Sequence, residues 1–120
     1  MSTRCRIGFE KENGEIISSY CHHDGYLEGV GEALKRFYNT PELAEKLAGL
    51  GDFSSLRETL EETKETCYNE SDHPFRTDKD WGEYEANIGR CGEEFTYLYK
   101  TDYSGVYGWQ VAETPYFKEF

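Results

Sequence analysis

The chain has 120 residues, with 24 acidic and 13 basic side chains, so its formal net charge is −11. This acidity disfavours binding to nucleic-acid phosphates, which requires clustered lysine and arginine. No apolar run approaches the ~20 residues that cross a membrane, and no apolar segment follows the N-terminus as in a signal peptide. We therefore expect a single domain over residues 1–120, located in a reducing cytoplasm.

Two strands joined by a tight turn are predicted at the start of the chain. Polar and apolar residues alternate over 5–11, and 15–21 has the composition of a return strand. Between them, Asn13 and Gly14 form the sequence typical of a type I′ turn, in which both central residues have positive φ. The sequence therefore predicts an antiparallel hairpin with a type I′ turn.

A helix is predicted next, because apolar residues recur at helical spacing from Val30 to Tyr38. We place this helix over roughly 27–38. Gly29 and Gly31 lie in its first turns, where glycine lowers helix stability. Their presence indicates a close backbone approach at that point, either by the hairpin or by a ligand.

Two further helices are predicted downstream. The sequence Thr-Pro-Glu at 40–42 supplies an N-cap, a proline at the first helical position and an acid in the first turn. The apolar face of this helix is Leu43, Ala44, Leu47 and Ala48. The sequence Ser-Leu-Arg-Glu at 55–58 fits a capping box, which predicts the start of a third helix. Its inward-facing residues are Leu56, Leu60 and Cys67.

The C-terminal half begins with residues 68–92, which show no periodicity and are predicted to form a long loop. Residues 94–100 are rich in aromatic and β-branched types, and they predict a second hairpin with 106–111 around a turn at 102–105. The tail at 115–120 carries three aromatic residues. We expect this tail to pack against the sheet, with a short docking peptide as the alternative.

Strands and helices are thus segregated along the chain, with strands at both ends and helices between them. Such segregation is typical of α+β folds. We predict an α+β fold whose antiparallel sheet is built from the N-terminal and C-terminal hairpins. About three helices would cover one face of that sheet.

The most distinctive segment is 20–26, with the sequence Tyr-Cys-His-His-Asp-Gly-Tyr. Its tyrosines would offer flat apolar faces to a ligand, and its histidines titrate near neutral pH, where an aspartate can orient them. The candidate ligand-binding residues are Tyr20, His22, His23, Asp24, Tyr26 and Trp109. The alternative is structural: Asp24 caps the following helix, Gly25 forms the turn and the tyrosines pack.

The same segment allows a small hydrolase, with Cys21 as nucleophile and His23 as base. A catalytic cysteine requires an electropositive environment, which this acidic chain disfavours. A metal site is also disfavoured, because the adjacent His22 and His23 would point to opposite faces of a strand. We therefore expect no enzymatic activity, no metal and no cofactor.

Most of the net negative charge falls between Glu58 and Glu94. Such a charge distribution repels nucleic acid and speeds association with basic protein surfaces, as in a nucleic-acid mimic. The candidate partner-binding residues are Glu58, Glu61, Glu62, Glu65, Asp78 and Asp80. A surface that serves only solubility is the alternative.

Segment 20–26, followed by Val30-Gly31, Leu34 and Tyr38, resembles a family of small proteins encoded by bacteriophages and bacterial mobile elements. Members of that family carry a Tyr-Cys-His-Trp-Asp-Gly-Tyr-like segment, so His23 replaces a tryptophan here. The stretch 50–56 and the Tyr-rich pair of strands near the C-terminus are also similar to the family pattern. Because the family has no settled activity, the resemblance implies a phage and host-cytoplasm context and no mechanism.

Three functions follow as hypotheses. The first is a non-enzymatic accessory protein that binds and inhibits or modulates a host or defence protein with a basic surface. The second is a domain that sequesters a small molecule or nucleotide at segment 20–26. The third is the small hydrolase that uses Cys21 and His23.

Overall fold

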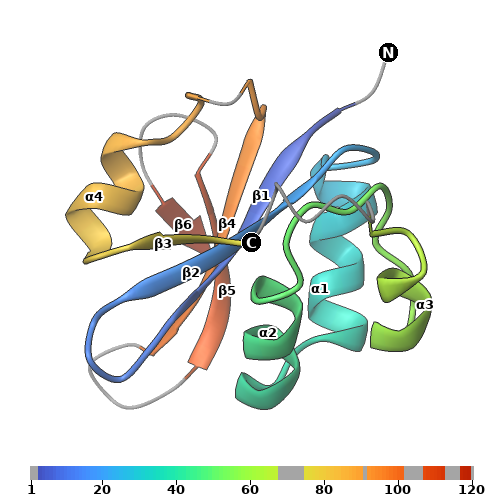
Figure 1. Cartoon of the computed structure of the whole chain (residues 1–120), viewed down its shortest axis with the longest axis horizontal. Coiled ribbons are helices and arrows are strands. Elements are labelled where there is room, and N and C mark those ends of the chain that lie inside the picture. The colour runs from blue at the N-terminus through green and yellow to red at the C-terminus, as the bar shows by residue number, and fades with distance from the viewer. Residues whose placement is uncertain (1–2, 68–74, 91, 102–106, 113–116, 120) are drawn as a thin grey trace.

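The computed structural model describes residues 3–67, 75–90, 92–101, 107–112 and 117–119, with the backbone alone at 101, 107 and 117–119 (Figure 1). Six strands form one sheet in the order β3-β2-β1-β4-β5-β6. The strands are β1 (Cys5–Glu10), β2 (Ile16–Cys21), β3 (Arg76–Asp78), β4 (Phe95–Thr101), β5 (Tyr107–Ala112) and β6 (Phe117–Glu119). The helices are α1 (Glu32–Phe37), extended at its start by a π-helical turn at Leu27–Gly31, α2 (Pro41–Ala48), α3 (Leu60–Lys64) and α4 (Trp81–Ala86).

The N-terminal hairpin is confirmed, but its turn is not of type I′. The backbone N–H of Gly14 donates to the Lys11 carbonyl at 2.9 Å, which closes a four-residue turn over 11–14. Of these four residues, only Gly14 has a positive φ, at 89°. Asn13 instead accepts a hydrogen bond on Oδ1 from the backbone N–H of Glu15 at 3.0 Å. This side-chain contact stabilises a three-residue loop in place of the predicted two-residue one.

The predicted α+β class is confirmed, whereas the prediction of a purely antiparallel sheet is wrong. Strands β1 and β2 are antiparallel, and so are β4 and β5, as the two hairpins require. The hairpins meet through β1 and β4, which run parallel. Parallel neighbours need a long crossover connection, and the chain between β2 and β4 provides it. The hydrophobic pattern of each strand is the same for either direction of pairing, so the sequence could not distinguish them.

The main core lies between the sheet and helices α1, α2 and α3, which cover one face as predicted (Figure 1). Alternate strand residues supply the sheet side of this core: Cys5, Ile7, Phe9, Ile17, Cys21, Tyr97, Tyr99, Trp109 and Val111. Val30, Leu34, Tyr38, Ala44, Leu47 and Ala48 supply the helix side. Helix α2 starts as predicted, because the Thr40 hydroxyl accepts from the Leu43 N–H at 3.3 Å and proline follows it.

The third helix begins later than predicted. Its N-cap is Thr59, whose hydroxyl accepts from the Glu62 N–H at 3.2 Å and donates to the Glu62 carboxylate at 3.0 Å. This Thr-x-x-Glu pair replaces the predicted cap at Ser55 because the backbone N–H of Ser55 donates to the Thr66 hydroxyl instead. Helix α3 is therefore one short turn, held against Tyr38 through the buried Thr63.

The opposite face of the sheet carries α4, although 68–92 was predicted to be a loop. Asp80 starts this helix by accepting from the Glu83 N–H at 2.9 Å, and Tyr84 packs between Ile16 and Leu98. Burial raises the pKa of Tyr84, so its phenol stays protonated and donates to the Tyr97 carbonyl at 2.8 Å. Only six residues form the helix, which is too short for a clear hydrophobic period.

Three other predictions concern glycine and the C-terminus. A Cβ at Gly29 would lie 2.5 Å from the Asp24 carbonyl oxygen, so the predicted close approach is to the segment that connects β2 to the helix, and not to a strand of the hairpin. Strand β6 pairs antiparallel with β5 through Phe117–Glu119, so this part of the tail extends the sheet at its edge. The predicted turn at 102–105 lies outside the described residues.

Candidate functional site

A segment that follows α2, centred on Phe53, forms hydrogen bonds with the end of β2. The backbone N–H of Phe53 donates to the Tyr20 carbonyl at 2.9 Å, and the His22 N–H donates to the Phe53 carbonyl at 3.2 Å. Phe53 is fully buried in the main core. Its burial holds the neighbouring Asp52 and Ser54 beside the two histidines.

One side of this strand end is built around His22. The imidazole Nε2 lies 2.6 Å from Oδ1 of Asp52, and the ring meets Tyr20 edge-on with 4.8 Å between centroids. The guanidinium of Arg6 lies over the Tyr20 ring, 5.4 Å from its centroid, and donates to the Ser18 hydroxyl at 3.0 Å. This side of the strand end therefore combines the Tyr20 ring with a guanidinium and an imidazole, both of which are bonded within the protein.

The other side is built around the exposed His23. Its Nδ1 lies 3.0 Å from the Ser54 carbonyl oxygen and 3.1 Å from the Ser54 hydroxyl. The Tyr26 hydroxyl donates to Asp24 Oδ1 at 3.4 Å, and both side chains are exposed. Asp24 has a left-handed backbone, with φ of 58°, and its carbonyl accepts from the Val30 N–H at 2.9 Å. Asp24 thus shapes the connection to α1 through its backbone, and the predicted cap by its side chain is not formed, because Tyr26 occupies the N-cap without a side-chain hydrogen bond.

Five of the six predicted ligand-binding residues lie along this strand end, and the sixth does not. Trp109 is only 5% exposed in the main core, where its indole N–H donates to the Tyr38 carbonyl at 3.2 Å. Its ring meets Tyr99 edge-on. Trp109 is therefore a core residue, because β5 directs it beneath the helices. The prediction missed Asp52 and Ser54, since a contact between segments 30 residues apart has no local signal.

The proposed nucleophile–base pair is not formed. Cys21 is fully buried, and its thiol donates to the backbone carbonyl of His23 at 3.3 Å. A hydrogen bond from Cys5 lowers the pKa of Cys21. The imidazole of His23, which lies beyond the end of β2, instead contacts Ser54. Over the described part of the chain, no three metal-ligating side chains gather as a metal site requires.

The predicted acidic partner surface is divided between the two faces of the sheet. Its four glutamates around α3, Glu58, Glu61, Glu62 and Glu65, are exposed on the helix side. Asp80 is exposed at the start of α4 on the opposite side. Asp78 is 1% exposed and accepts from Arg76 Nε and Asn87 Nδ2, each at 3.0 Å. Asp78 is thus buried and bonded within the fold, unlike the other five acids, which are exposed.

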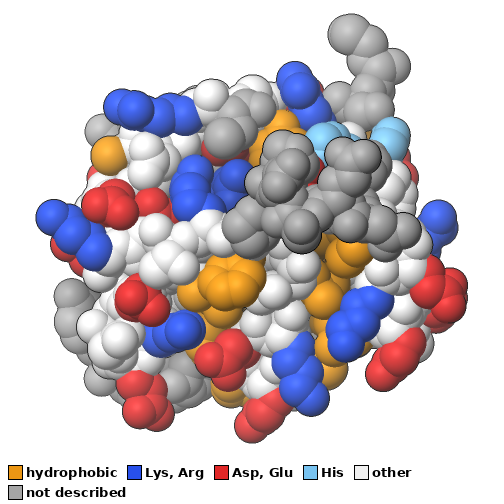
Figure 2. Space-filling view, in the orientation of Figure 1, with side chains coloured by type: hydrophobic (Ala, Val, Ile, Leu, Met, Phe, Trp, Pro, Cys, Tyr) orange, Lys and Arg blue, Asp and Glu red, His pale blue; other side chains and the backbone are white. Residues whose placement is uncertain are grey.

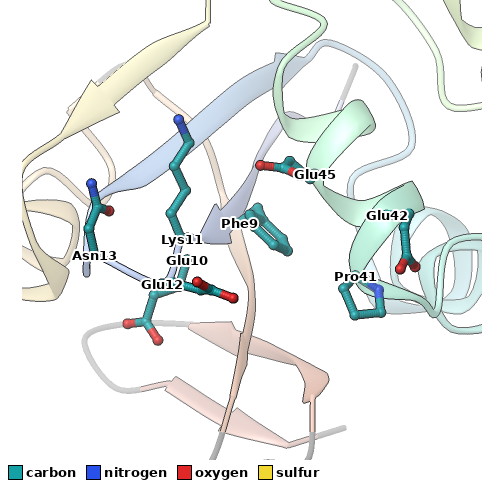
Figure 3. Close-up of a pocket in the computed structure, with 8 residues that line it drawn as sticks. All are labelled: Phe9, Glu10, Lys11, Glu12, Asn13, Pro41, Glu42 and Glu45. Atoms are coloured by element: carbon teal, nitrogen blue, oxygen red, sulfur yellow. The ribbon is translucent and has the colours of Figure 1, made fainter.

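A second acidic region, which the sequence analysis missed, surrounds a hollow between the β1–β2 turn and α2 (Figure 3). The hollow has a volume of about 460 Å³. We call it the acidic hollow; it is lined by Phe9, Glu10, Lys11, Glu12, Asn13, Pro41, Glu42 and Glu45. Phe9 lies between the turn residues and the first turn of α2 (Figure 3). The hollow therefore combines an aromatic ring with four carboxylates from two separate elements.

The charges around the acidic hollow are unbalanced. Lys11 is its one basic residue, and that side chain is paired with Glu15 at 3.6 Å. None of the four carboxylates has an ion pair within the described residues. On the face of the molecule drawn in Figure 2, acidic and basic side chains are interspersed. The lining of the hollow differs from such mixed surface in its excess of negative charge.

Comparison with protein-family models, curated proteins and solved structures finds no match for this chain. Among the described residues, no helix is long and apolar enough to span a membrane. The function is therefore argued from the geometry of the strand end and the acidic hollow.

Proposed function

We propose that this protein is a non-enzymatic binding protein for a basic protein segment, which inserts a lysine or arginine side chain into the acidic hollow. The observation that carries this proposal is the hollow itself, where Pro41 and the small exposed part of Phe9 offer apolar surface among four carboxylates. The long stems of lysine and arginine bury well along apolar surface. Their charged ends would then meet the carboxylates of Glu10, Glu42 and Glu45.

The charge of the whole chain supports the same class of partner. A net charge of −11 attracts a basic surface at long range and raises the rate of encounter. The exposed glutamates of α3 lie on the same side of the sheet and add to this attraction. The resemblance to bacteriophage proteins makes a cytoplasmic host or defence protein, inhibited or modulated by the binding, the natural class of partner.

Reversing two charges at the acidic hollow tests this proposal. The probe is a ten-residue peptide rich in arginine and lysine, titrated into the ¹⁵N-labelled protein while amide shifts are recorded. We expect the largest shifts at 10–13 and 41–45. The double substitution Glu42→Lys, Glu45→Lys should weaken binding at least about tenfold, because two attractions become repulsions in a partly enclosed site.

A matched variant distinguishes the effect of the hollow on peptide affinity from the effect of net charge. Glu61→Lys, Glu65→Lys changes the net charge equally, and both side chains are exposed at α3. We expect this control to lower affinity only slightly, since exposed charges are screened by water and salt. An equal loss of affinity in both variants would show that the chain attracts the peptide without using the hollow.

The strand end supports a second candidate function, the capture of a small anionic molecule such as a nucleotide. The specific observation is that Asp52 and Ser54, from one segment, hold the imidazoles of His22 and His23 in place. A base could stack on exposed aromatic surface at Tyr26, and a phosphate could accept hydrogen bonds from the imidazoles.

Thermal unfolding in the presence of AMP, GMP, CMP and UMP tests this second function. A ligand at about 100 times its Kd raises the free energy of unfolding by about 2.7 kcal/mol through mass action, which gives a clear rise in Tm. The rise should disappear in His22→Ala and persist in Glu61→Ala, which lies away from the strand end. No change in Tm with any of the four nucleotides would rule out nucleotide capture at this site.

A further inference from the structure

Cys5 and Cys21 face each other across the open end of the N-terminal hairpin. Cys5 begins β1, Cys21 ends β2, and the two residues are direct partners in the antiparallel register. Direct partners lie roughly 4.5–5.5 Å apart between Cα atoms, which is inside the range that a disulfide spans. Both side chains are fully buried on the helix-covered face, so they point the same way.

Each of the two thiols shifts the pKa of the other. A hydrogen bond with Cys5 lowers the pKa of Cys21. Burial, followed by this hydrogen bond, raises the pKa of Cys5. Cys21 is thus the thiol that ionises first and acts as the attacking group.

We propose that Cys5 and Cys21 form a reversible disulfide that makes this end of the hairpin sensitive to the redox state of its surroundings. The oxidant is a low-molecular-weight disulfide such as oxidised glutathione. The Cys21 thiolate attacks one glutathione sulfur, forms a mixed disulfide and releases one glutathione thiolate. Cys5 then attacks the Cys21 sulfur and releases the second glutathione. The two thiol protons pass to the two glutathiones, so one disulfide is consumed and one is formed.

The position of the cysteine pair explains how an oxidant reaches it and what a disulfide would change. It occupies the last rung of the hairpin, where strand ends open more readily than the middle of a sheet. Gly25 lies directly against Cys5, and its N–H donates to the Thr3 carbonyl at 2.8 Å. A disulfide would therefore tie the start of β1 to the segment that carries His22 and His23. Oxidation would hold this strand end closed, and reduction would release it.

Peptide mapping after oxidation tests the proposal on the full chain. The protein is incubated with oxidised glutathione, its remaining thiols are alkylated, and it is digested with trypsin without reduction. Because trypsin cleaves after Arg4, Arg6, Lys11 and Lys35, we expect the dipeptide 5–6 linked to peptide 12–35. The linked species should lack about 2 Da relative to the sum of its two thiol peptides and should disappear on reduction.

Two further measurements make the outcome decisive. In the Cys67→Ser, Cys91→Ser background, oxidation should raise Tm by several degrees, and dithiothreitol should reverse the rise. The same treatment of Cys5→Ser in that background should leave a single glutathione adduct on Cys21 and no rise in Tm. Recovery of Cys5 and Cys21 as separate alkylated or glutathionylated peptides from the wild-type chain would overturn the proposal, whether or not the variants fold.

Discussion

Trp109→Ala is expected to lower the free energy of unfolding by about 3–5 kcal/mol, the largest loss that we expect from any single substitution. The indole is 5% exposed, meets the Tyr99 ring with 5.1 Å between centroids, and donates to the Tyr38 carbonyl at 3.2 Å. Its removal leaves a cavity between the sheet and the helices and an unpaired carbonyl. Denaturation with urea, monitored by circular dichroism, measures the effect.

Trp109→Phe is the matched variant, because it keeps most of the ring volume and removes the indole N–H. We expect it to cost about 1–2 kcal/mol. Both variants should bind peptide or nucleotide with unchanged affinity at temperatures where they are folded. A Trp109→Ala protein as stable as the wild type would show that the indole is not packed in the core as described.

Asp78→Ala is expected to lower the free energy of unfolding by about 2–3 kcal/mol. The carboxylate is 1% exposed and accepts hydrogen bonds from Arg76 and Asn87, so its loss leaves both donors without their acceptor. These contacts fasten β3 to α4 at one edge of the sheet. The effect is measured by chemical denaturation, and faster hydrogen exchange in 76–87 should accompany it.

Glu61→Ala is the control for Asp78→Ala, since both remove one carboxylate. Glu61 is exposed on α3, and its removal should change stability by less than about 0.5 kcal/mol. If Asp78→Ala were as mild as Glu61→Ala and instead weakened binding of the basic peptide, Asp78 would belong to a partner surface after all.

The contrast between Asp78 and the glutamates of α3 shows where reasoning from charge alone fails. The sequence places all six candidate acids in one strongly negative stretch, yet the sheet separates α3 from α4 (Figure 1). Acidic residues far apart in the sequence instead meet around one hollow: Glu10 at the end of β1, Glu12 in the turn, and Glu42 and Glu45 of α2. No local pattern could reveal that meeting.

The candidate site at the end of β2 was predicted in part. The sequence identified Tyr20, His22 and His23 because tyrosines and histidines beside a turn are unusual in composition. It could not identify Asp52 and Ser54, which contact the histidines only because buried Phe53 docks beside β2. Loops between helices carry no periodic signal that fixes their long-range contacts.

The sequence by itself determined the features that depend on neighbouring residues. Alternation over 5–11 and the strand composition of 15–21 specified the first hairpin, and Thr40 followed by Pro41 specified the start of α2. These signals are local because backbone geometry and capping act within a few residues. The segregation of strands and helices then specified the α+β class.

Only the tertiary structure decided which strand edges meet, where the short helices lie and which polar residues are buried. Joining β1 to β4 in parallel, rather than antiparallel, leaves the same apolar side chains facing the helices. Six-residue α4 forms because Tyr84 packs against Ile16 and Leu98, and this burial outweighs its weak local preference. Such choices depend on apolar surface and hydrogen-bonding groups supplied by distant segments, which a sequence does not bring together until it folds.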